Sequence, residues 1–384
     1  MAGVYVHLPF CPYICPYCDF AKWPHKRSAA QRYLQALYGE MALRAAQHDE
    51  CGAHANERFT SLFLGGGTPN TYDAQDVARL VQRLREAFPG SADRETTIEV
   101  NPELVREGDL RAYREAGINR ISIGVQSFAA DEIKTLGRRH TMEDVERVVR
   151  GARDAGIQSV SIDLIFAVPG QTPESWRRSL ETAISLGVDH ISTYGLTIET
   201  GTPYETWQAR EPAAFFDDTR EAELYEIAIE TLEAAGFAQY EISNFARPGH
   251  ESAHNANYWA NGEYVGLGVG AASYRGGVRS VHTRDLESYI GAASEGRSIP
   301  GESERLEGAQ RAGEAVMLSL RTAQGVCVAS FKERYGLDFL EFYAPVIEQY
   351  RGLGLLETDA THVRLTRRGR FLANDVCAAF VTFA

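Results

Sequence analysis

Three cysteines near the start of the chain are spaced like the ligands of a metal cluster. Cys11, Cys15 and Cys18 form a C-x3-C-x2-C pattern just after the apolar stretch at residues 4–6. A [4Fe–4S] cluster is normally held by four thiolates, and a protein tunes it through ligation, hydrogen bonding and exposure. Three thiolates leave one iron with open sites for an outside chelator. The pattern therefore predicts a cluster that binds a second molecule through its unfilled iron.

The same cysteines have two other interpretations. Closely spaced cysteines in an intracellular protein often bind zinc. Structural zinc nearly always has four nitrogen or sulfur ligands, and His25 is the candidate for the fourth position. A disulfide is the other alternative. The remaining cysteines, at positions 51, 327 and 377, stand singly in the sequence, and the cluster is the favoured interpretation.

A glycine-rich turn follows the second apolar run of the chain. Gly65, Gly66 and Gly67 precede Thr68 and Pro69, and glycine lets the backbone approach a ligand closely because it has no Cβ atom. The Gly-Lys-Ser/Thr ending of a phosphate-binding P-loop does not follow. A tight turn from a strand into a helix explains the glycines equally well. The turn becomes a candidate binding element only beside the three cysteines.

Polar side chains stand at or near the ends of three further apolar runs, namely Glu99, Gln126 and Asp163. Burying a carboxylate costs several kcal/mol unless a partner compensates its lost hydration. Two carboxylates in one site therefore require donors. A bound adenosyl cofactor would supply hydroxyl and amino groups. Arg138 would supply a guanidinium in the alternative, an internal ion-pair network.

Short β-branched runs alternate with amphipathic stretches from residue 4 to about residue 195. We expect strands at residues 4–7, 61–64, 96–100, 120–125, 159–166 and 190–194. Helical periodicity covers residues 74–88 and 142–155. The alternation indicates α/β architecture with a parallel sheet, and six such units form an open or partial (β/α)6 barrel. Active sites of barrels lie at the carboxyl ends of the strands, where each motif above falls.

The chain is expected to divide into three segments. Residues 1–200 form the partial barrel with the cluster, and residues 201–304 extend it with a helix near 218–235 and a glycine-rich stretch at 262–277. Residues 305–384 form a winged-helix-like α+β module of two or three helices, a hairpin from residues 352–356 and 363–366, and a closing helix. A basic group in this module is more often a solvated face than a docking site. It consists of Arg364, Arg367, Arg368 and Arg370.

The composition is that of an ordinary globular protein and argues against some partners. The 384 residues are 44% hydrophobic and 24% charged. A formal net charge of −13 disfavours nucleic acids and anionic membrane surfaces. We read neither a signal peptide nor a run of 18 apolar residues in the sequence. The expected location is the cytoplasm, where thiols stay reduced.

Taken together, these motifs resemble those of the radical S-adenosylmethionine (SAM) family, in which the amino and carboxylate groups of SAM fill the vacant iron site. Over residues 4–384 the chain resembles the oxygen-independent coproporphyrinogen III oxidase family, and more closely its HemW-type haem chaperone branch. The resemblance implies that Cys11, Cys15 and Cys18 hold a [4Fe–4S] cluster. It also implies a set of SAM contacts: Tyr5, Tyr17, Gly66, Gly67, Thr68, Glu99, Gln126, Arg138 and Asp163.

Two departures separate the chain from the oxidases of that family. The oxidases read C-x3-C-x2-C-x-C, whereas Phe20 occupies the last position here. The oxidases also have an amino-terminal extension that contributes to the substrate site, and this chain begins almost on the first strand. Both departures disfavour the alternative function, a radical SAM oxidoreductase acting on a porphyrinogen. A third hypothesis, a winged-helix regulator with a redox-sensing cluster, is disfavoured by the acidic net charge.

A last motif links the chain to haem. Residues 254–259 match the H-N-x-x-Y-W signature of the chaperone branch, which is associated there with haem binding. Imidazole is a good axial ligand for haem iron, and aromatic rings can cover the macrocycle, although a histidine beside aromatic residues is more often structural. The haem candidates are His250, His254, Asn255, Tyr258 and Trp259.

The resemblance thus implies a haem chaperone that binds SAM at its cluster and hands haem to an acceptor protein. It places the transfer in the cytoplasm or peripherally at the membrane face, and it leaves a homodimer open. Coproporphyrinogen III oxidase activity is not expected.

Overall fold

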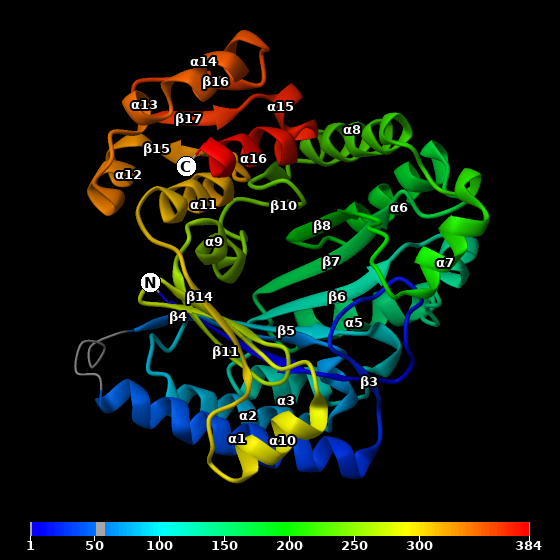
Figure 1. The fold of residues 1–384 in the computed structure, drawn as a ribbon. Helices are drawn as coiled ribbons and strands as arrows, with labels where there is room; N and C mark the ends of the chain where they lie inside the picture. The colour runs from blue at the N-terminus through cyan, green and yellow to red at the C-terminus, as the bar shows by residue number, and fades with distance from the viewer. Residues whose placement is uncertain (1, 51–57, 384) are drawn as a thin grey trace.

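A twelve-stranded mixed sheet forms the centre of the molecule, with the strand order β14-β13-β12-β11-β1-β4-β5-β6-β7-β8-β10-β9. The computed structural model describes residues 2–50 and 58–383 (Figure 1), so Cys51 lies outside it. Six neighbouring strands run parallel and follow the order of the chain. They are β1 (Ala2–Leu8), β4 (Phe59–Gly66), β5 (Glu95–Val100), β6 (Arg120–Gln126), β7 (Ser159–Phe166) and β8 (His190–Gly195).

Helices connect these parallel strands and cover the outer face of the sheet (Figure 1). The crossover helices are α1 (Arg27–Glu50), α2 (Ala74–Ala87), α3 (Asp109–Glu115), α4 (Ala130–Thr135), α5 (Met142–Asp154) and α6 (Pro173–Ser185). Helices α5 and α6 are capped by Thr141 and Thr172, which directly precede them and whose hydroxyl oxygens accept a hydrogen bond from the amide three residues on. Helices α2 and α5 match the predicted helices at 74–88 and 142–155 to within one residue at each end.

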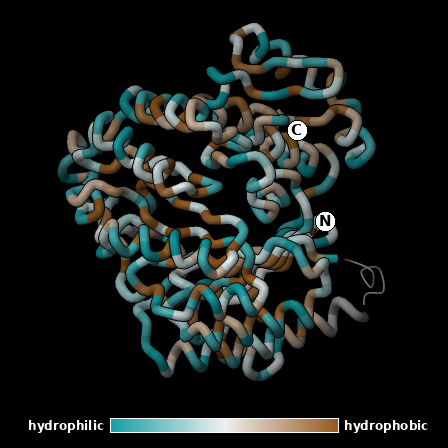
Figure 2. Tube along the Cα trace, turned by 180° about the vertical axis from the view of Figure 1, so that it is seen from behind, coloured by the Kyte–Doolittle hydropathy of each residue, from teal (hydrophilic) through white to brown (hydrophobic). Residues whose placement is uncertain are grey.

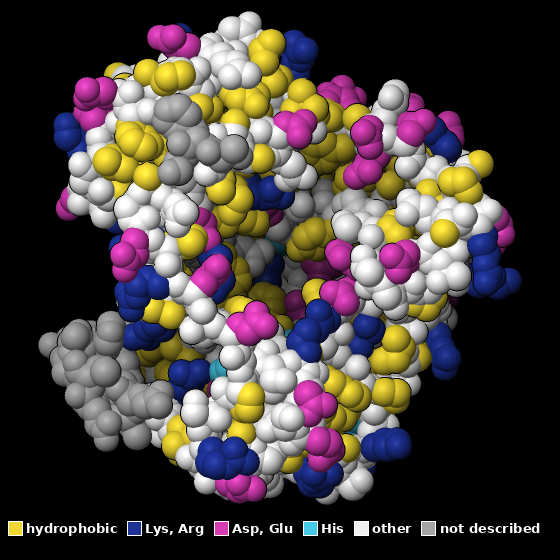
Figure 3. Space-filling view, viewed as in Figure 1, with side chains coloured by type: hydrophobic (Ala, Val, Ile, Leu, Met, Phe, Trp, Pro, Cys, Tyr) yellow, Lys and Arg dark blue, Asp and Glu magenta, His cyan; other side chains and the backbone are white. Residues whose placement is uncertain are grey.

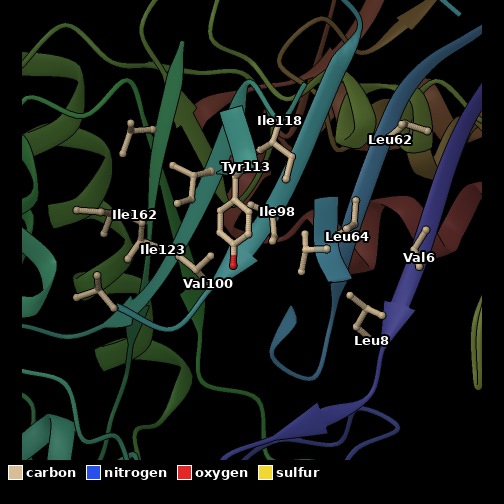
Figure 4. Packing of buried hydrophobic residues seen from close by; sticks show 14 of the residues in the cluster. Val6, Leu8, Leu62, Leu64, Ile98, Val100, Tyr113, Ile118, Ile123 and Ile162 are labelled. Atoms are coloured by element: carbon tan, nitrogen blue, oxygen red, sulfur yellow. The ribbon is translucent and has the colours of Figure 1, made fainter. Parts of the chain in front are cut away.

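The strands alternate between two kinds of side chain because successive residues point to opposite faces. Apolar residues such as Val6, Leu64 and Ile98 point outward, where Tyr113 of α3 joins them in the buried core (Figure 4). The residues between them are largely polar, for example Glu99 on β5 and Asp163 on β7. The inner face of the sheet therefore carries mainly polar side chains, and helices cover its outer face. In Figure 2 the hydrophobic segments concentrate in the strands and alternate with hydrophilic positions on the outer helices.

The sheet continues beyond the parallel strands on both sides. Next to β1 lies β11 (Glu263–Leu267), which is also parallel, although more than 250 residues separate the paired positions Ala2 and Glu263. Antiparallel strands complete both edges: β12 (Ala272–Arg275), β13 (Val278–His282) and β14 (Gly301–Arg305) on one side, β10 (Asn244–Ala246) and β9 (Ala238–Gln239) on the other. The remaining helices here are α7 (Pro203–Arg210), α8 (Asp218–Ala234), α9 (Ala253–Trp259) and α10 (Leu286–Ser294).

The carboxyl-terminal segment has a separate hydrophobic core and a three-stranded sheet. Four helices precede its hairpin, where two or three were expected, and the predicted strand at 352–356 contributes only Leu356 because α14 extends to Gly352. The elements are α11 (Gly308–Leu320), β15 (Val326–Cys327), α12 (Val328–Tyr335), α13 (Phe339–Phe342), α14 (Ala344–Gly352), β16 (Leu356–Thr358), β17 (His362–Leu365), α15 (Arg367–Phe371) and α16 (Ala373–Phe383).

The basic group in this segment is used within the chain. Arg367 pairs with Glu226 and Glu233 of α8, and Arg370 donates to Oε1 of Gln239 at 2.6 Å. Arg364 and Arg368 also contact acceptors nearby, namely Asp359 and the Leu353 carbonyl. These contacts remove the main reason to expect an external acidic partner at this surface.

The predicted fold class is confirmed: an α/β molecule with an open, partial barrel and an α+β carboxyl-terminal segment. The edges at β14 and β9 do not pair with each other, so the sheet does not close. The space-filling view in Figure 3 is deeply hollowed at its centre, below the carboxyl-terminal segment. No helix among the described residues is both long enough and apolar enough to cross a membrane.

Candidate cluster and cofactor site

A cleft of about 520 Å3 lies where the parallel strands end, and it gathers almost every predicted cluster and SAM residue. The predicted residues that line it are Cys11, Cys15, Tyr17, Cys18, Gly66, Gly67, Thr68, Glu99, Gln126, Arg138 and Asp163. Tyr5 is the exception, because it lines a neighbouring cavity instead. Side chains from five strands and the loops after them thus converge on one volume, as expected for the carboxyl face of a barrel.

Cys11 ends β2 (Phe10–Cys11), and Cys15 and Cys18 lie on the loop between β2 and β3 (Trp23–Pro24), here called the cluster loop. Buried His7 holds the end of this loop, since its Nε2 atom lies 2.7 Å from the carbonyl oxygen of Ala21. Among the described residues no three His, Cys, Asp or Glu side chains are grouped around a single ion position, and exposed His25 does not line the cleft. A structural zinc ion takes four ligands, whereas a cluster distributes three cysteines over different irons and leaves one iron open. The donor set fits the cluster.

Burial controls the acidity of the Cys11 and Cys18 thiols. Loss of hydration raises the pKa of Cys11 to about 11, and the neighbouring Cys18 and Cys15 raise it further, while a hydrogen bond with Thr68 acts in the opposite direction. Burial also raises the pKa of Cys18. Because a metal ligand must be a thiolate, assembly of a cluster here would release protons.

The glycine turn allows the backbone to pack closely behind the cleft. Gly66 has φ +107°, and a Cβ atom there would lie 2.5 Å from the His7 ring. A Cβ on Gly67 would lie 2.7 Å from the backbone of Pro9. The glycines are therefore required by the chain's own packing, as the tight-turn interpretation predicts. One of the amides still faces a functional group, since the Gly66 N–H donates to Oε2 of Glu99 at 3.2 Å.

The two carboxylates of the cleft are held in different ways. Burial, followed by the charge of Asp163, raises the pKa of Glu99 to about 8, so Glu99 retains its proton near neutral pH. Burial also raises the pKa of Asp163, but hydroxyl groups partly offset the effect. Ser192 Oγ donates to Asp163 at 2.7 Å and Ser122 Oγ at 3.0 Å. Strongly shifted carboxyl groups in a cleft are typical of functional sites.

Arg138 is buried and binds neutral acceptors. Its Nη2 atom donates to Oδ1 of Asn101 at 2.8 Å and to the Gly124 carbonyl at 2.6 Å, and its Nη1 atom lies 3.9 Å from Sγ of Cys15. In the described part of the chain, its hydrogen bonds do not reach Glu99 or Asp163. The alternative of an internal ion-pair network requires a contact between Arg138 and these carboxylates, and the hydrogen bonds of Arg138 do not supply it.

Gln126 has an unusual backbone conformation at the mouth of β6. Its φ of 69° lies in the left-handed region, and the pairing of β6 with β7 shifts register between Gly124 and Gln126. A non-glycine residue held there is strained, and such strain clusters at ligand sites. The bulge turns the Gln126 side chain into the cleft, where it is half-buried.

Several residues of the cleft were not singled out from the sequence. Tyr13, Asn101, Tyr194 and Glu199 also line it, and Ser192 orients Asp163. The sequence contained a signal that could have identified two of them as cleft residues. Asn101 directly follows β5, and Ser192 falls on the inner face by the period-two alternation of β8.

The H-N-x-x-Y-W motif lies on α9, away from the cluster cleft. His254 is 1% exposed, and its Nδ1 and Nε2 atoms each lie 2.8 Å from a hydroxyl oxygen, those of Ser61 and Tyr258. Burial, followed by the charge of Arg120, lowers the pKa of His254 to about 3, so its ring is neutral. His250 precedes α9 and is half-buried, as are Asn255, Tyr258 and Trp259.

The architecture and the cleft agree with the comparisons to known proteins. Residues 5–183 match the radical SAM superfamily model, and residues 306–372 match the HemN C-terminal domain model. Heme chaperone HemW of Bacillus subtilis is 35% identical over 382 residues, which cover 99% of both chains. The chain belongs to the HemW family. Another member, heme chaperone HemW of Escherichia coli, is 32% identical, with 99% of this chain and 98% of the relative covered.

The fold of this HemW family member also matches a solved structure. Coproporphyrinogen III oxidase (HemN) of Escherichia coli, described as a radical SAM enzyme, superposes with a TM-score of 0.84 at 27% identity. The match covers 100% of this chain and 90% of the other. The predicted resemblance to the oxidase family and its HemW branch is thereby confirmed.

Proposed function

We propose that the protein is a haem chaperone, which binds haem and a SAM-ligated [4Fe–4S] cluster and delivers haem to an acceptor protein. The observation that carries the proposal is the full-length similarity to heme chaperone HemW proteins. The matched length spans nearly the whole chain, in which residues 11–18 carry the three cysteines and residues 254–259 the H-N-x-x-Y-W motif. Delivery in the cytoplasm, or peripherally at the membrane face, is part of the proposal, as is a homodimeric state.

The cluster cleft supports the cofactor part of the proposal. Cys11, Cys15 and Cys18 would hold the cluster, which when bound would supply the electron for reductive cleavage of SAM. The ammonium group of SAM would favour ionisation of Glu99 and donate hydrogen bonds to it, and the Gly66 amide behind Glu99 keeps its carboxyl group in place. Asp163, fixed by Ser122 and Ser192, is suited to accept hydrogen bonds from ribose hydroxyls. The other proposed contacts that line the cleft are Tyr17, Gly67, Thr68, Gln126 and Arg138.

The absence of a cysteine at position 20 favours the chaperone over the oxidase. Phe20 stands at that position with 62% of its surface exposed. It adds an apolar surface beside the proposed cluster instead of a further thiolate. The alternative function is that of a porphyrinogen oxidoreductase, and the experiment must distinguish it from a haem chaperone.

A transfer assay tests the proposal. The cluster is reconstituted without oxygen, ferric haem is titrated by absorption, and the loaded protein is mixed with a haem-free globin. We expect saturable haem binding and transfer to the globin. The matched control is Cys327→Ala, and replacement of Cys11, Cys15 and Cys18 by alanine should remove iron and sulfide. Absence of saturable haem binding, or catalytic decarboxylation of coproporphyrinogen III, would contradict the proposal.

A further inference from the structure

Arg120 is a buried cation inside the barrel. It is the first residue of β6, 4% of its surface is exposed, and its Nε atom is buried without a hydrogen-bond partner. Ser122 points to the same face of the sheet because side chains alternate along a strand, and its hydroxyl donates to Asp163 in the cluster cleft. The Arg120 side chain therefore lies on the inner face of the sheet, below the cleft, where the strands begin.

The charge of Arg120 lacks a direct partner. Within the part of the chain that the structure describes, no salt bridge involves its guanidinium. Glu95 stands at the same end of the sheet, but its carboxylate accepts hydrogen bonds from the Ala253 and His254 amides at 2.8 and 3.0 Å. A buried charge is costly unless other charges compensate it. The compensation for Arg120 must therefore come from groups further along the inner face.

The two carboxyl groups of the cluster cleft lie within reach of this charge. Burial raises the pKa of both Glu99 and Asp163, and the positive charge of Arg120 opposes the rise at both of them. Such interactions extend further in a protein interior than in water, because little solvent screens them. The hydrogen bonds of Arg138, by contrast, go to neutral acceptors. Arg120 thus supplies the counter-charge that the sequence suggested for Arg138.

Asp163 is better prepared than Glu99 to be the charged partner of Arg120. The Ser192 and Ser122 hydroxyls donate to Asp163 at 2.7 and 3.0 Å, and two donors suit an ionised carboxylate, which only accepts hydrogen bonds. Glu99, with a pKa of about 8, keeps its proton near neutral pH in the empty site. Arg120 and Asp163 then form a separated pair of opposite charges inside the barrel.

His190, His254 and Tyr240 also face Arg120, and each of them is neutral. The Nδ1 and Nε2 atoms of His190 lie 2.8 and 2.9 Å from the Ser161 and Tyr240 hydroxyl oxygens. Burial, followed by the charge of Arg120, lowers the pKa of both histidines. Burial raises the pKa of Tyr240. A change of pH between 6 and 9 should therefore titrate the carboxyl groups of the cleft without charging these three side chains.

We propose that Arg120 is a positioning residue of the SAM site, whose charge keeps Asp163 ionised so that its carboxylate can accept hydrogen bonds from both ribose hydroxyls. The inference rests on the proposed function, in which Asp163 binds the ribose. A protonated Asp163 would offer a donor where the ribose hydroxyls need acceptors. Arg120 does not line the cleft, so it acts through Asp163 and without touching the ligand.

Equilibrium dialysis of SAM against the anaerobically reconstituted full-length protein, from pH 6 to pH 9, tests the inference. Arg120→Met removes the charge, and we expect about tenfold weaker SAM binding at neutral pH, with recovery as the pH rises, because the binding profile moves up by about one pH unit. Arg120→Lys keeps the charge and should keep the wild-type profile. A loss by the same factor at every pH, or an unchanged affinity in Arg120→Met, would overturn the inference.

Arg94→Met is the matched control for the loss of a buried arginine. Arg94 is 5% exposed, and its guanidinium donates to the Phe88 carbonyl oxygen, away from the two carboxyl groups of the cleft. This variant should be less stable than the wild type but should bind SAM with an unshifted pH profile. The comparison separates the effect of the Arg120 charge on the SAM site from a general loss of packing.

The charge of Asp163 can also be measured without cluster or SAM. In wild-type protein with carbon-13 in its aspartate carboxyl groups, NMR should show the Asp163 signal, assigned by its loss in Asp163→Asn, titrating below neutral pH. An Asp163 that is protonated at neutral pH would overturn the inference, even if Arg120→Met failed to fold. Failure of the wild type to bind SAM or haem would instead contradict the proposed function, and the carboxyl titration would still decide the charge of Asp163.

Discussion

The Nε2 atom of His254 lies 2.8 Å from the hydroxyl oxygen of Tyr258, one helical turn further along α9. The Nδ1 atom of the same ring contacts the Ser61 hydroxyl on β4. The ring of Phe63 stacks on the imidazole, with the two ring centroids 5.1 Å apart. His254 therefore fastens α9 to the inner face of the sheet. The histidine of the motif has a structural task whether or not a ligand is present.

Replacement of His254 should consequently destabilise the protein without any ligand. His254→Ala removes a buried ring and leaves the Ser61 and Tyr258 hydroxyls unpaired, so we expect a loss of about 3 kcal/mol in the free energy of unfolding. Urea denaturation of the cluster-free protein measures it. His250→Ala serves as the control and should cost less than about 1 kcal/mol. Equal stability of the two variants would show that the His254 contacts contribute nothing.

Glu95 should stabilise the start of the same helix. It accepts hydrogen bonds from the Ala253 and His254 amides at 2.8 and 3.0 Å and from the Ser252 hydroxyl at 3.3 Å. Glu95→Gln removes the negative charge beside the positive end of α9, at a cost of about 1 kcal/mol. Faster amide hydrogen exchange within α9 would report the loss. Exposed Glu86→Gln should leave this exchange unchanged.

Glu99 should make the stability of the empty protein depend on pH. Its pKa rises from 4.5 to about 8 on folding, so between these values the folded protein holds a proton that the unfolded chain has lost. Stability contributed by neutral Glu99 is therefore complete below about pH 4.5, declines as the pH rises toward 8, and then levels off. Urea midpoints at pH 5.5 and 8.5 test this. The urea midpoint of Glu99→Gln should rise relative to that of the wild type between pH 5.5 and pH 8.5. An equal difference between the two midpoints at both pH values would refute the prediction.

Arg138 should control how well the cluster assembles. Arg138→Ala leaves the Asn101 side chain and the Gly124 carbonyl without their donor and removes the cation 3.9 Å from the Cys15 sulfur. We expect less than half of the wild-type iron and sulfide per chain after anaerobic reconstitution. Arg139→Ala is the matched control, because Arg139 is the next residue in the chain and its side chain is exposed. Full cluster content in Arg138→Ala would rule out this role.

The sequence predicted the parallel strands well because their signal is local. Each of the six expected strands lies within an observed one, and β7 agrees at both ends. The inner-face residues followed from the same signal, since a polar residue within an apolar run, such as Glu99 or Asp163, must point away from the core. Strand β11 was missed because its partner β1 lies far away in the sequence and its glycine-rich surroundings resemble a loop.

The sequence could not separate the two cavities. Tyr5 is one residue of a strand whose end borders the cluster cleft, yet its side chain lies in the neighbouring cavity with Tyr258. Likewise the sequence indicated His254 and Tyr258 together as haem candidates, but it could not show which of them faces open space. These distinctions depend on how α9 packs on β4, a contact between segments about 190 residues apart.

Strand β14 has a consequence for self-association. All five of its residues, Gly301–Arg305, are exposed, and three of them carry charge. An edge strand of this kind discourages another chain from hydrogen-bonding to it, because pairing would strip its charged side chains of water. The charged edge therefore disfavours open-ended growth of the sheet into fibres, and we expect a homodimer of this protein to form through a different face.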